Sequence, residues 1–350
     1  MSASLISQLI CFCIPRQEDY LSLKHELLFV IKTYLFSQSG VREDVSLDDW
    51  QSLVEGECRL LWVDARSFTK GDLDILAQRF NLHSLALESC LDGYRRPHLY
   101  EFEDHFYVNM TMVKPGHNKV KLKPLELHLF VGGRFIITAL NESECDAVDK
   151  ALEEFFDTPG LCARGPMYAV YLLAEDLVET YFPIVERLDD TADKLESSLL
   201  SKADQKSLKL NLDLKHEGFE LRKLLGPQRD ILNDLSRRSF PFIGEESGVY
   251  FQDVYNRMIR IFDMLDTIRE ILSSNLDIYL SSVSNRLNEV MKVLTVAATV
   301  LMTVSIIPSF YGMNCDIPLL HHKLTFPAIM VSMVGITGGM LAWFRRRGWL

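Results

Sequence analysis

The sequence predicts an α/β cytoplasmic domain, a helical hairpin, a long helical stalk and two C-terminal transmembrane helices. Three observations lead to this fold class. Residues 1–160 alternate strand-like and helix-like patterns, residues 249–292 contain no proline or glycine, and two uncharged apolar runs lie near the C-terminus. A chain of 350 residues has room for about two soluble units and a membrane part.

The composition limits the classes of partner. The formal net charge of −11 argues against nucleic acid as a partner and is compatible with cation binding. The seven cysteines include no CxxC pair, so the spacing predicts neither a disulfide framework nor a zinc ribbon. The N-terminus carries no basic residue before Arg16 and makes a poor signal peptide. The soluble part is therefore expected in the cytoplasm.

The N-terminal domain is expected to contain a mixed sheet. Aromatic and β-branched residues give strand signals over Leu60–Asp64, Tyr100–Val113 and Leu125–Leu140. Helix-like stretches lie at Gly71–Phe80 and Glu144–Phe156. The chain shows no phosphate loop, dinucleotide fingerprint, HExxH motif or nucleophile elbow. The sequence therefore gives no reason to predict an enzyme.

Residues 161–248 are expected to form a helical hairpin. Its two helical stretches cover Pro166–Leu200 and Ala203–Leu235, and Gly226-Pro227 is expected to interrupt or bend the second. The first stretch carries a run of carboxylates: Glu186, Asp189, Asp190, Asp193 and Glu196. A solvated helix face and a cation-attracting surface are both compatible with this run.

Residues 249–311 predict one long stalk helix that continues into the membrane. Apolar residues recur in a 4-3-4 rhythm, which is typical of a helix packed against partners. They are Ile261, Leu265, Ile268, Leu272, Leu276, Leu280, Val283, Leu287, Val290 and Leu294. An unbroken helix from Val249 to Phe310 would be about 93 Å long at 1.5 Å per residue. Pro308 lies close to its end, where a kink is tolerable.

Two apolar runs are each long enough to cross a membrane. Val293–Tyr311 has 19 residues and Leu324–Phe344 has 21, and neither contains a charge. A hydrocarbon core of about 30 Å needs roughly 20 such residues in a helix. Residues 312–323 form the loop between them, and residues 345–350 form a basic tail that begins with three arginines. Because basic residues flank both runs on the side away from the loop, both termini are expected in the cytoplasm.

One face of the first span is small, polar or thioether-bearing. Its members follow 3-4 helical spacing: Asn288, Met291, Thr295, Ala298, Met302, Ser305 and Ser309. Two helices cannot enclose a pore alone, so this face would line a pore built from several copies. Ordinary packing of small residues between membrane helices is the alternative, and Thr299 with Thr303 gives a second polar strip that fits it.

The first span ends in Tyr311-Gly312-Met313-Asn314. An uncharged amide at the outer end of a span can hold a hydrated cation without binding it irreversibly. With the stalk segment 279–295, the tail 345–350 and the segment 251–255, this motif resembles the CorA family of magnesium transporters over nearly the whole chain.

The resemblance implies a funnel-shaped homopentamer in the plasma (inner) membrane. Five first spans would line the pore, and Gly312, Met313 and Asn314 would form the outer selectivity filter. Carried over by position, the pore-lining residues are Asn288, Met291, Leu294, Met302 and Ser305. Leu294 lies outside the stripe derived from helical spacing, and with Met291 it would form the hydrophobic constriction. Mg²⁺ gives up its water reluctantly, and a ring of amide carbonyls can bind the hydrated ion through that water.

The resemblance also implies regulation: channels of this family close when cytoplasmic Mg²⁺ occupies acidic sites between the cytoplasmic domains of neighbouring subunits. Asp253 matches one acidic partner in these sites, and Ser89 stands where an aspartate is common. Glu88 is the remaining candidate for the second partner. We therefore expect feedback by Mg²⁺ that is weaker than usual in the family.

The outer loop departs from the family pattern as well. Asp316 supplies a carboxylate, while Cys315, His321 and His322 are softer donors that suit Zn²⁺, Co²⁺ or Ni²⁺. Three hypotheses follow: a passive Mg²⁺ channel that also takes Co²⁺ and Ni²⁺, a Zn²⁺ or other transition-metal transporter that could run outward, and a membrane-anchored scaffold without transport. The sequence predicts no resident cofactor beside the transported or regulatory metal ion.

Overall fold

The computed structural model describes residues 31–55, 59–92, 96–114, 123–201, 203–238, 248–313 and 324–349. The chain divides into two compact units. The first unit takes its described residues from 1–193 and 212–270, and the second from 194–211 and 271–350. Each unit is described by itself.

A seven-stranded mixed sheet forms the centre of the first unit, as the sequence predicted. The strand order is β2-β1-β3-β7-β6-β5-β4, with β3 and β7 parallel and all other neighbours antiparallel. The strands are β1 (Ile31–Ser37), β2 (Gly40–Glu43), β3 (Leu60–Arg66), β4 (His98–Glu101), β5 (His105–Lys114), β6 (Lys123–Gly132) and β7 (Phe135–Leu140). The two long strand signals thus resolve into hairpins, because polar turns separate β4 from β5 and β6 from β7.

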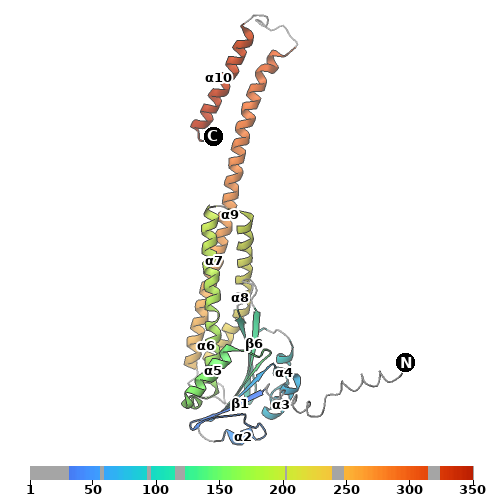
Figure 1. Ribbon diagram of the computed structural model, residues 1–350, viewed down its shortest axis with the longest axis vertical. Coiled ribbons are helices and arrows are strands. Elements are labelled where there is room, and N and C mark those ends of the chain that lie inside the picture. The colour runs from blue at the N-terminus through green and yellow to red at the C-terminus, as the bar shows by residue number, and fades with distance from the viewer. Residues whose placement is uncertain are drawn as a thin grey trace, which may run out of the picture. The chain divides into compact units, whose positions relative to one another are not determined.

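Helices cover both faces of the sheet (Figure 1). The short α2 (Trp50–Leu53) lies ahead of α3 (Lys70–Phe80) and α4 (Ser84–Leu91), and α3 packs Leu73 and Leu76 against Val63 of the sheet. A capping box between Thr69 and Asp72 starts α3. On the other face, Phe155 of α5 (Asp146–Asp157) packs against Trp62.

The helical hairpin differs from the prediction at two places. A 3-10 turn, η2 (Pro159–Arg164), leads into α6 (Pro166–Glu179), and a separate α7 (Phe182–Ser201) follows. The helix predicted over residues 166–200 is therefore two helices, because Pro183 cannot donate to the carbonyl of Glu179. By contrast, α8 (Gln205–Arg237) continues through Pro227. The interruption expected at Gly226-Pro227 is wrong, although a bend there was the stated alternative.

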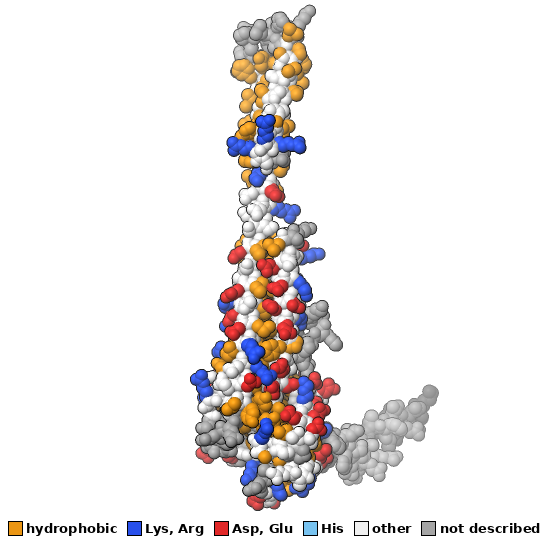
Figure 2. Space-filling view, turned by 90° about the vertical axis from the view of Figure 1, so that its left-hand side faces the viewer, with side chains coloured by type: hydrophobic (Ala, Val, Ile, Leu, Met, Phe, Trp, Pro, Cys, Tyr) orange, Lys and Arg blue, Asp and Glu red, His pale blue; other side chains and the backbone are white. Residues whose placement is uncertain are grey.

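The stalk helix and the second span form as expected. α9 runs from Gly248 to Tyr311 as one helix of 64 residues and includes Pro308. α10 covers Thr325–Arg346. In the second unit, Asn211 of α8 donates from Nδ2 to the carbonyl of Leu272 in α9 at 3.0 Å, and this contact is buried. Figure 2 shows apolar side chains over the α9–α10 pair and a band of Lys and Arg side chains at the end that carries the α10 C-terminus.

Candidate ion pathway and regulatory site

The apolar parts of α9 and α10 find almost no cover within the chain. Both helices are long and apolar enough to cross a membrane, and only 6% and 0% of their most apolar windows are buried. A core helix of a soluble protein would bury most of such a window. The two helices therefore need another apolar environment, either lipid or further copies of the chain.

The predicted pore-lining face of α9 is exposed along its length. This holds for every residue assigned to it: Asn288, Met291, Leu294, Thr295, Ala298, Met302 and Ser305. The covered side of the same helix lies elsewhere, since Val296 is buried and Thr299 and Thr303 are half-buried. α10 runs beside α9 in this unit (Figure 1). Packing against α10 thus uses the second polar strip and leaves the predicted pore face open.

The hydroxyl groups of α9 donate to their own helix. Thr295 Oγ1 bonds the carbonyl of Met291 at 2.7 Å, and Ser305 Oγ bonds the carbonyl of Leu301 at 2.7 Å. Each hydroxyl thereby donates its hydrogen to the helix backbone, and the lone pairs of its oxygen stay available to accept hydrogen bonds. The water molecules around a cation point their hydrogens outward. A face of such acceptors can therefore bind a hydrated cation without a charged ligand.

An open groove of about 550 Å³ adjoins the end of this face that lies nearest to Asn288. Asn288, Met291 and Thr295 line it together with Trp349 from the C-terminal tail. The remaining lining residues are Asn285, Glu289 and Lys292. The groove is polar on the helix side, so water has access to the lower part of the predicted pore face.

The motif after the first span begins where α9 ends. The amide of Gly312 donates to the carbonyl of Pro308 at 2.8 Å, and a Cβ at Gly312 would lie 3.1 Å from that oxygen. A larger residue would therefore crowd the last turn. Gly312 and Met313 are exposed. The proposed filter amide of Asn314 and the predicted loop contacts Asp316, His321 and His322 lie outside the described residues.

The predicted regulatory residue Asp253 is ion-paired within the chain. Its carboxylate lies 3.0 Å from Nε of Arg257, one turn along α9. The same guanidinium contacts Glu179 at 2.7 Å and Glu175 at 3.2 Å, both on α6. Burial alone would lower the pKa of Arg257, but the bond to Glu179 and the neighbouring carboxylates raise it overall. Each nitrogen of the guanidinium thus faces a carboxylate.

Among the described residues, no ion pair or hydrogen bond joins Asp253 to the second predicted partner, Glu88. Glu88 is exposed on α4, whereas Asp253 is exposed on α9. Ser89 is fully buried and donates to the carbonyl of Leu85 at 2.9 Å. The position where the family commonly has an aspartate therefore points into the domain.

The carboxylate run on α7 forms no chelating group. In the part of the chain that the structure describes, no three His, Cys, Asp or Glu side chains are placed to hold a metal ion. Burial raises the pKa of Asp189, and the nearby charges of Asp193 and Asp190 add to this. The lack of a chelating group among the described residues excludes neither a solvated helix face nor a cation-attracting surface.

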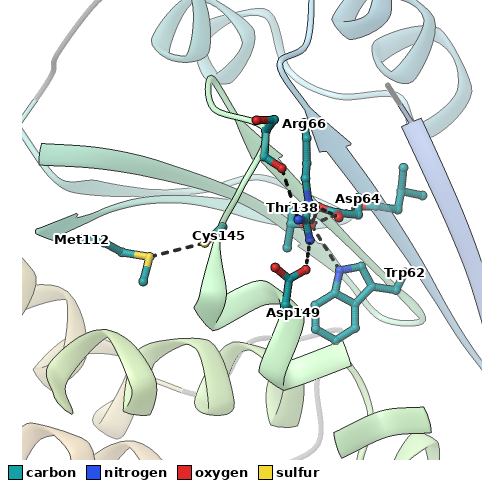
Figure 3. A network of polar contacts seen from close by, with 9 residues as sticks. Trp62, Asp64, Arg66, Met112, Thr138, Cys145 and Asp149 are labelled. Carbon is teal, nitrogen blue, oxygen red and sulfur yellow. Dashed lines mark hydrogen bonds and ion pairs between the residues drawn. The ribbon is translucent and has the colours of Figure 1, made fainter. Parts of the chain in front are cut away.

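A second set of polar residues is structural (Figure 3). Thr138 Oγ1 donates to Asp64 at 2.8 Å and accepts from Trp62 Nε1 at 3.2 Å. Arg66 bridges Asp64 at 2.7 Å and Asp149 of α5 at 2.5 Å. Asp64 is only 2% exposed. These contacts join β3, β7 and α5.

Comparison with known proteins decides the family. The profile described as CorA-like Mg²⁺ transporter protein matches residues 57–346. A cobalt/magnesium transport protein CorA from Thermotoga maritima is 33% identical over 292 residues, which is 83% of each chain. The chain belongs to the CorA family. The family is one of membrane transporters and not of enzymes, in agreement with the motifs that the sequence lacks.

Solved structures of CorA-like proteins share the fold. The complete CorA structure from Methanocaldococcus jannaschii aligns with a TM-score of 0.76 at 24% identity, and covers 92% of this chain and 99% of that one. The ZntB cytoplasmic domain from Vibrio parahaemolyticus aligns with a TM-score of 0.52 at 11% identity, and covers 72% of this chain and 98% of that one. Both likenesses concern the fold alone.

Proposed function

We propose that this chain is one subunit of a homopentameric channel that conducts Mg²⁺, and also Co²⁺ and Ni²⁺, across the plasma (inner) membrane. Five copies of α9 line the pore, and both termini of every copy lie in the cytoplasm. The observation that carries the proposal is the uncovered polar face of α9, which leads directly into Gly312-Met313-Asn314. The Mg²⁺ and Co²⁺ transport named for the Thermotoga maritima relative supports it.

The pore passes the ion with its water. Asn314 of each copy rings the outer mouth and binds the hydration shell through its amide oxygen. Thr295, Ser305 and Asn288 continue the row of acceptors, while Met291 with Leu294 forms an apolar constriction. Such a constriction gates by excluding water when it narrows. An uncharged pore holds a divalent cation weakly enough to release it.

Liposomes that contain the purified protein test the proposal. We expect Mg²⁺ entry that is lost in Asn314→Ala. Two neighbouring alanines of α9 give a matched pair: Ala298 lies on the proposed pore face, and Ala297 lies about 100° away around the helix and off that face. Ala298→Phe is expected to reduce flux at least tenfold, whereas Ala297→Phe retains it. Equal loss in both alanine variants would contradict the assignment of the pore face.

Transport of Zn²⁺ is the second candidate function. Asp316, His321 and His322 in the outer loop favour it, because imidazole is a better ligand for Zn²⁺ than for Mg²⁺. The same liposomes measure Zn²⁺ beside Mg²⁺. Zn²⁺ flux without Mg²⁺ flux would assign the protein to transition-metal transport. No flux of either ion, in a protein that still assembles, would support the scaffold hypothesis.

A further inference from the structure

The cytoplasmic acidic cluster of the first unit already contains a cation. The cluster consists of Glu175 and Glu179 on α6 and Asp253 on α9, and Arg257 lies among all three carboxylates. The family resemblance implies a regulatory metal ion at Asp253. Arg257 contacts one oxygen of each carboxylate, namely Asp253 Oδ2, Glu179 Oε1 and Glu175 Oε1. A metal ion would have to use the remaining oxygens beside the fixed positive charge of the guanidinium. The residues of this chain therefore fit the implied metal site poorly.

We propose that Arg257 replaces the regulatory cation in this protein, so that cytoplasmic Mg²⁺ binds the acidic cluster weakly and closes the channel poorly. The inference rests on the proposed function for its link to gating. Its binding part concerns Arg257 and the three carboxylates alone.

Tethering favours the arginine over a free ion. Arg257 lies one helical turn from Asp253, so its guanidinium stays near the cluster at an effective concentration of at least the millimolar range. A guanidinium is weakly hydrated and offers several N–H groups in a fixed fork. Mg²⁺ must instead lose or share tightly held water. Three separate carboxylates from two helices match the fork better than they match a small octahedral ion.

Electrostatics opposes joint occupancy. One guanidinium offsets one of three carboxylate charges, so the cluster keeps a net charge of −2 and still attracts cations. However, a divalent ion that reaches Asp253 must come within a few ångströms of the guanidinium. Repulsion at that distance weakens binding by about tenfold or more, even near water. Removal of the arginine charge should therefore create a stronger metal site.

The second predicted partner does not compensate for this loss. Ser89 is buried and bonded to the carbonyl of Leu85, so it offers no ligand at the surface. Glu88 is the exposed carboxylate of that helix, and Asp253 pairs with Arg257 and not with Glu88.

Mg²⁺ titration of the full-length protein in detergent tests the proposal. The readout is the rise in the thermal unfolding midpoint with MgCl₂ at constant ionic strength, relative to the metal-free sample of the same variant. We expect the half-saturating Mg²⁺ concentration to be at least about tenfold lower in Arg257→Gln than in the wild type. Arg257→Lys keeps the charge but not the fork and should fall between the two.

Two controls make the result specific. Arg260→Gln removes the same charge from an exposed position one turn further along α9 and should titrate like the wild type. The double variant Arg257→Gln/Asp253→Asn should lose the tighter Mg²⁺ binding that is expected for Arg257→Gln alone. The same half-saturation in the wild type and Arg257→Gln, no Mg²⁺ effect in Arg257→Gln, or a gain that survives Asp253→Asn would each overturn the proposal.

Flux measurements test the role of Arg257 separately from the proposed transport function. Asn314→Ala should abolish transport and leave the cytoplasmic titration unchanged. In liposomes, Mg²⁺ on the cytoplasmic side should inhibit Arg257→Gln at concentrations at least about tenfold lower than the wild type. Tight closure of the wild type by sub-millimolar Mg²⁺ would overturn the regulatory part, even if transport itself is confirmed.

Discussion

His128 on β6 is a buried base that links folding to pH. It is 0% exposed, and its Nδ1 lies 2.8 Å from the hydroxyl of Tyr107. Burial lowers the pKa of His128 to about 4, and the charge of His98 adds to the effect. An unfolded histidine titrates near 6.5. Between these values the unfolded chain binds a proton that the folded chain does not, so stability falls as the pH drops through this window.

We expect His128 alone to cost on the order of 3 kcal/mol between pH 7 and pH 4. The measurement is the apparent unfolding midpoint of the full-length protein in detergent across this range. His128→Gln should show a smaller loss at low pH, whereas the exposed His216→Gln should behave like the wild type. The same loss in His128→Gln and the wild type would contradict the assignment.

The buried setting of Ser89 opposes an acidic side chain at this position. Its side chain is fully buried on α4, so Ser89→Asp would place a carboxylate in the domain interior. We expect a loss of more than about 2 kcal/mol, since a carboxylate charge is costly to bury in a domain interior. Ser89→Ala should lose about 1 kcal/mol with its hydrogen bond. Chemical denaturation of both variants measures this, and a stable Ser89→Asp with tighter Mg²⁺ binding would contradict it.

The sequence was enough to single out Asp253 as a candidate site residue. It was not enough to predict which charged side chains surround Asp253. The spacing of Asp253 and Arg257 is visible as a one-turn pair on a helix. The contact that matters joins Arg257 to Glu179, which is 78 residues away in the chain. Only the packing of α6 against α9 makes it. The sequence analysis did not predict the cluster around Arg257. Of its three ion pairs, only Asp253–Arg257 can be seen from the spacing along the chain.

At the scale of elements, the contacts around Asp64 join two strands to a helix. Asp64 and Thr138 lie on the parallel pair β3–β7, and Arg66 reaches from β3 to Asp149 on α5 (Figure 3). The buried carboxylate receives two donors, whereas Asp149 is half-exposed. Water can therefore take the place of Arg66 as the partner of Asp149, but it cannot easily reach the buried Asp64.

Substitution of the two carboxylates should separate these contributions. Asp64→Ala removes the buried partner of Arg66 and Thr138, and we expect a loss of about 3 kcal/mol. Asp149→Ala breaks an exposed pair, and we expect a loss below about 1 kcal/mol. Urea denaturation, followed by tryptophan fluorescence to which Trp62 beside this network contributes, measures both. Equal losses would show that burial does not decide the strength of these pairs.

Element boundaries followed the sequence where the local signal was unopposed. The uninterrupted stalk gave α9, and Thr69 with Asp72 capped α3. The prediction failed where one proline ended a helix and another did not. Pro183 breaks the α6–α7 run beside the fully buried Tyr181, while Pro227 stays inside α8, whose Leu225, Ile231 and Leu232 are buried. Tertiary packing decides whether a helix ends at a proline or continues through it. The periodicity of apolar residues in the sequence does not show that packing.

At the scale of the whole molecule, the apolar stripe of α9 changes its surroundings along its length. Ile261, Leu265, Ile268 and Leu272 are buried within the chain. Further along, Leu280 and Leu287 are 56% and 60% exposed, and Val290 and Leu294 are exposed as well. An apolar stripe of this length on a single helix favours association. The pattern supports the proposed pentamer, because other copies of α9 would cover these residues.

Charge placed on this stripe should therefore disrupt assembly. We expect the wild type in mild detergent to have five times the 40.2 kDa mass of one chain by native mass spectrometry. Leu287→Glu puts like charges against each other around the axis and should yield smaller species at neutral pH. Asn285→Glu adds the same charge about 160° away around the helix and should leave the mass unchanged. An intact pentamer in Leu287→Glu would remove the stalk stripe from the interface, and a wild-type mass other than fivefold would reject the pentamer itself.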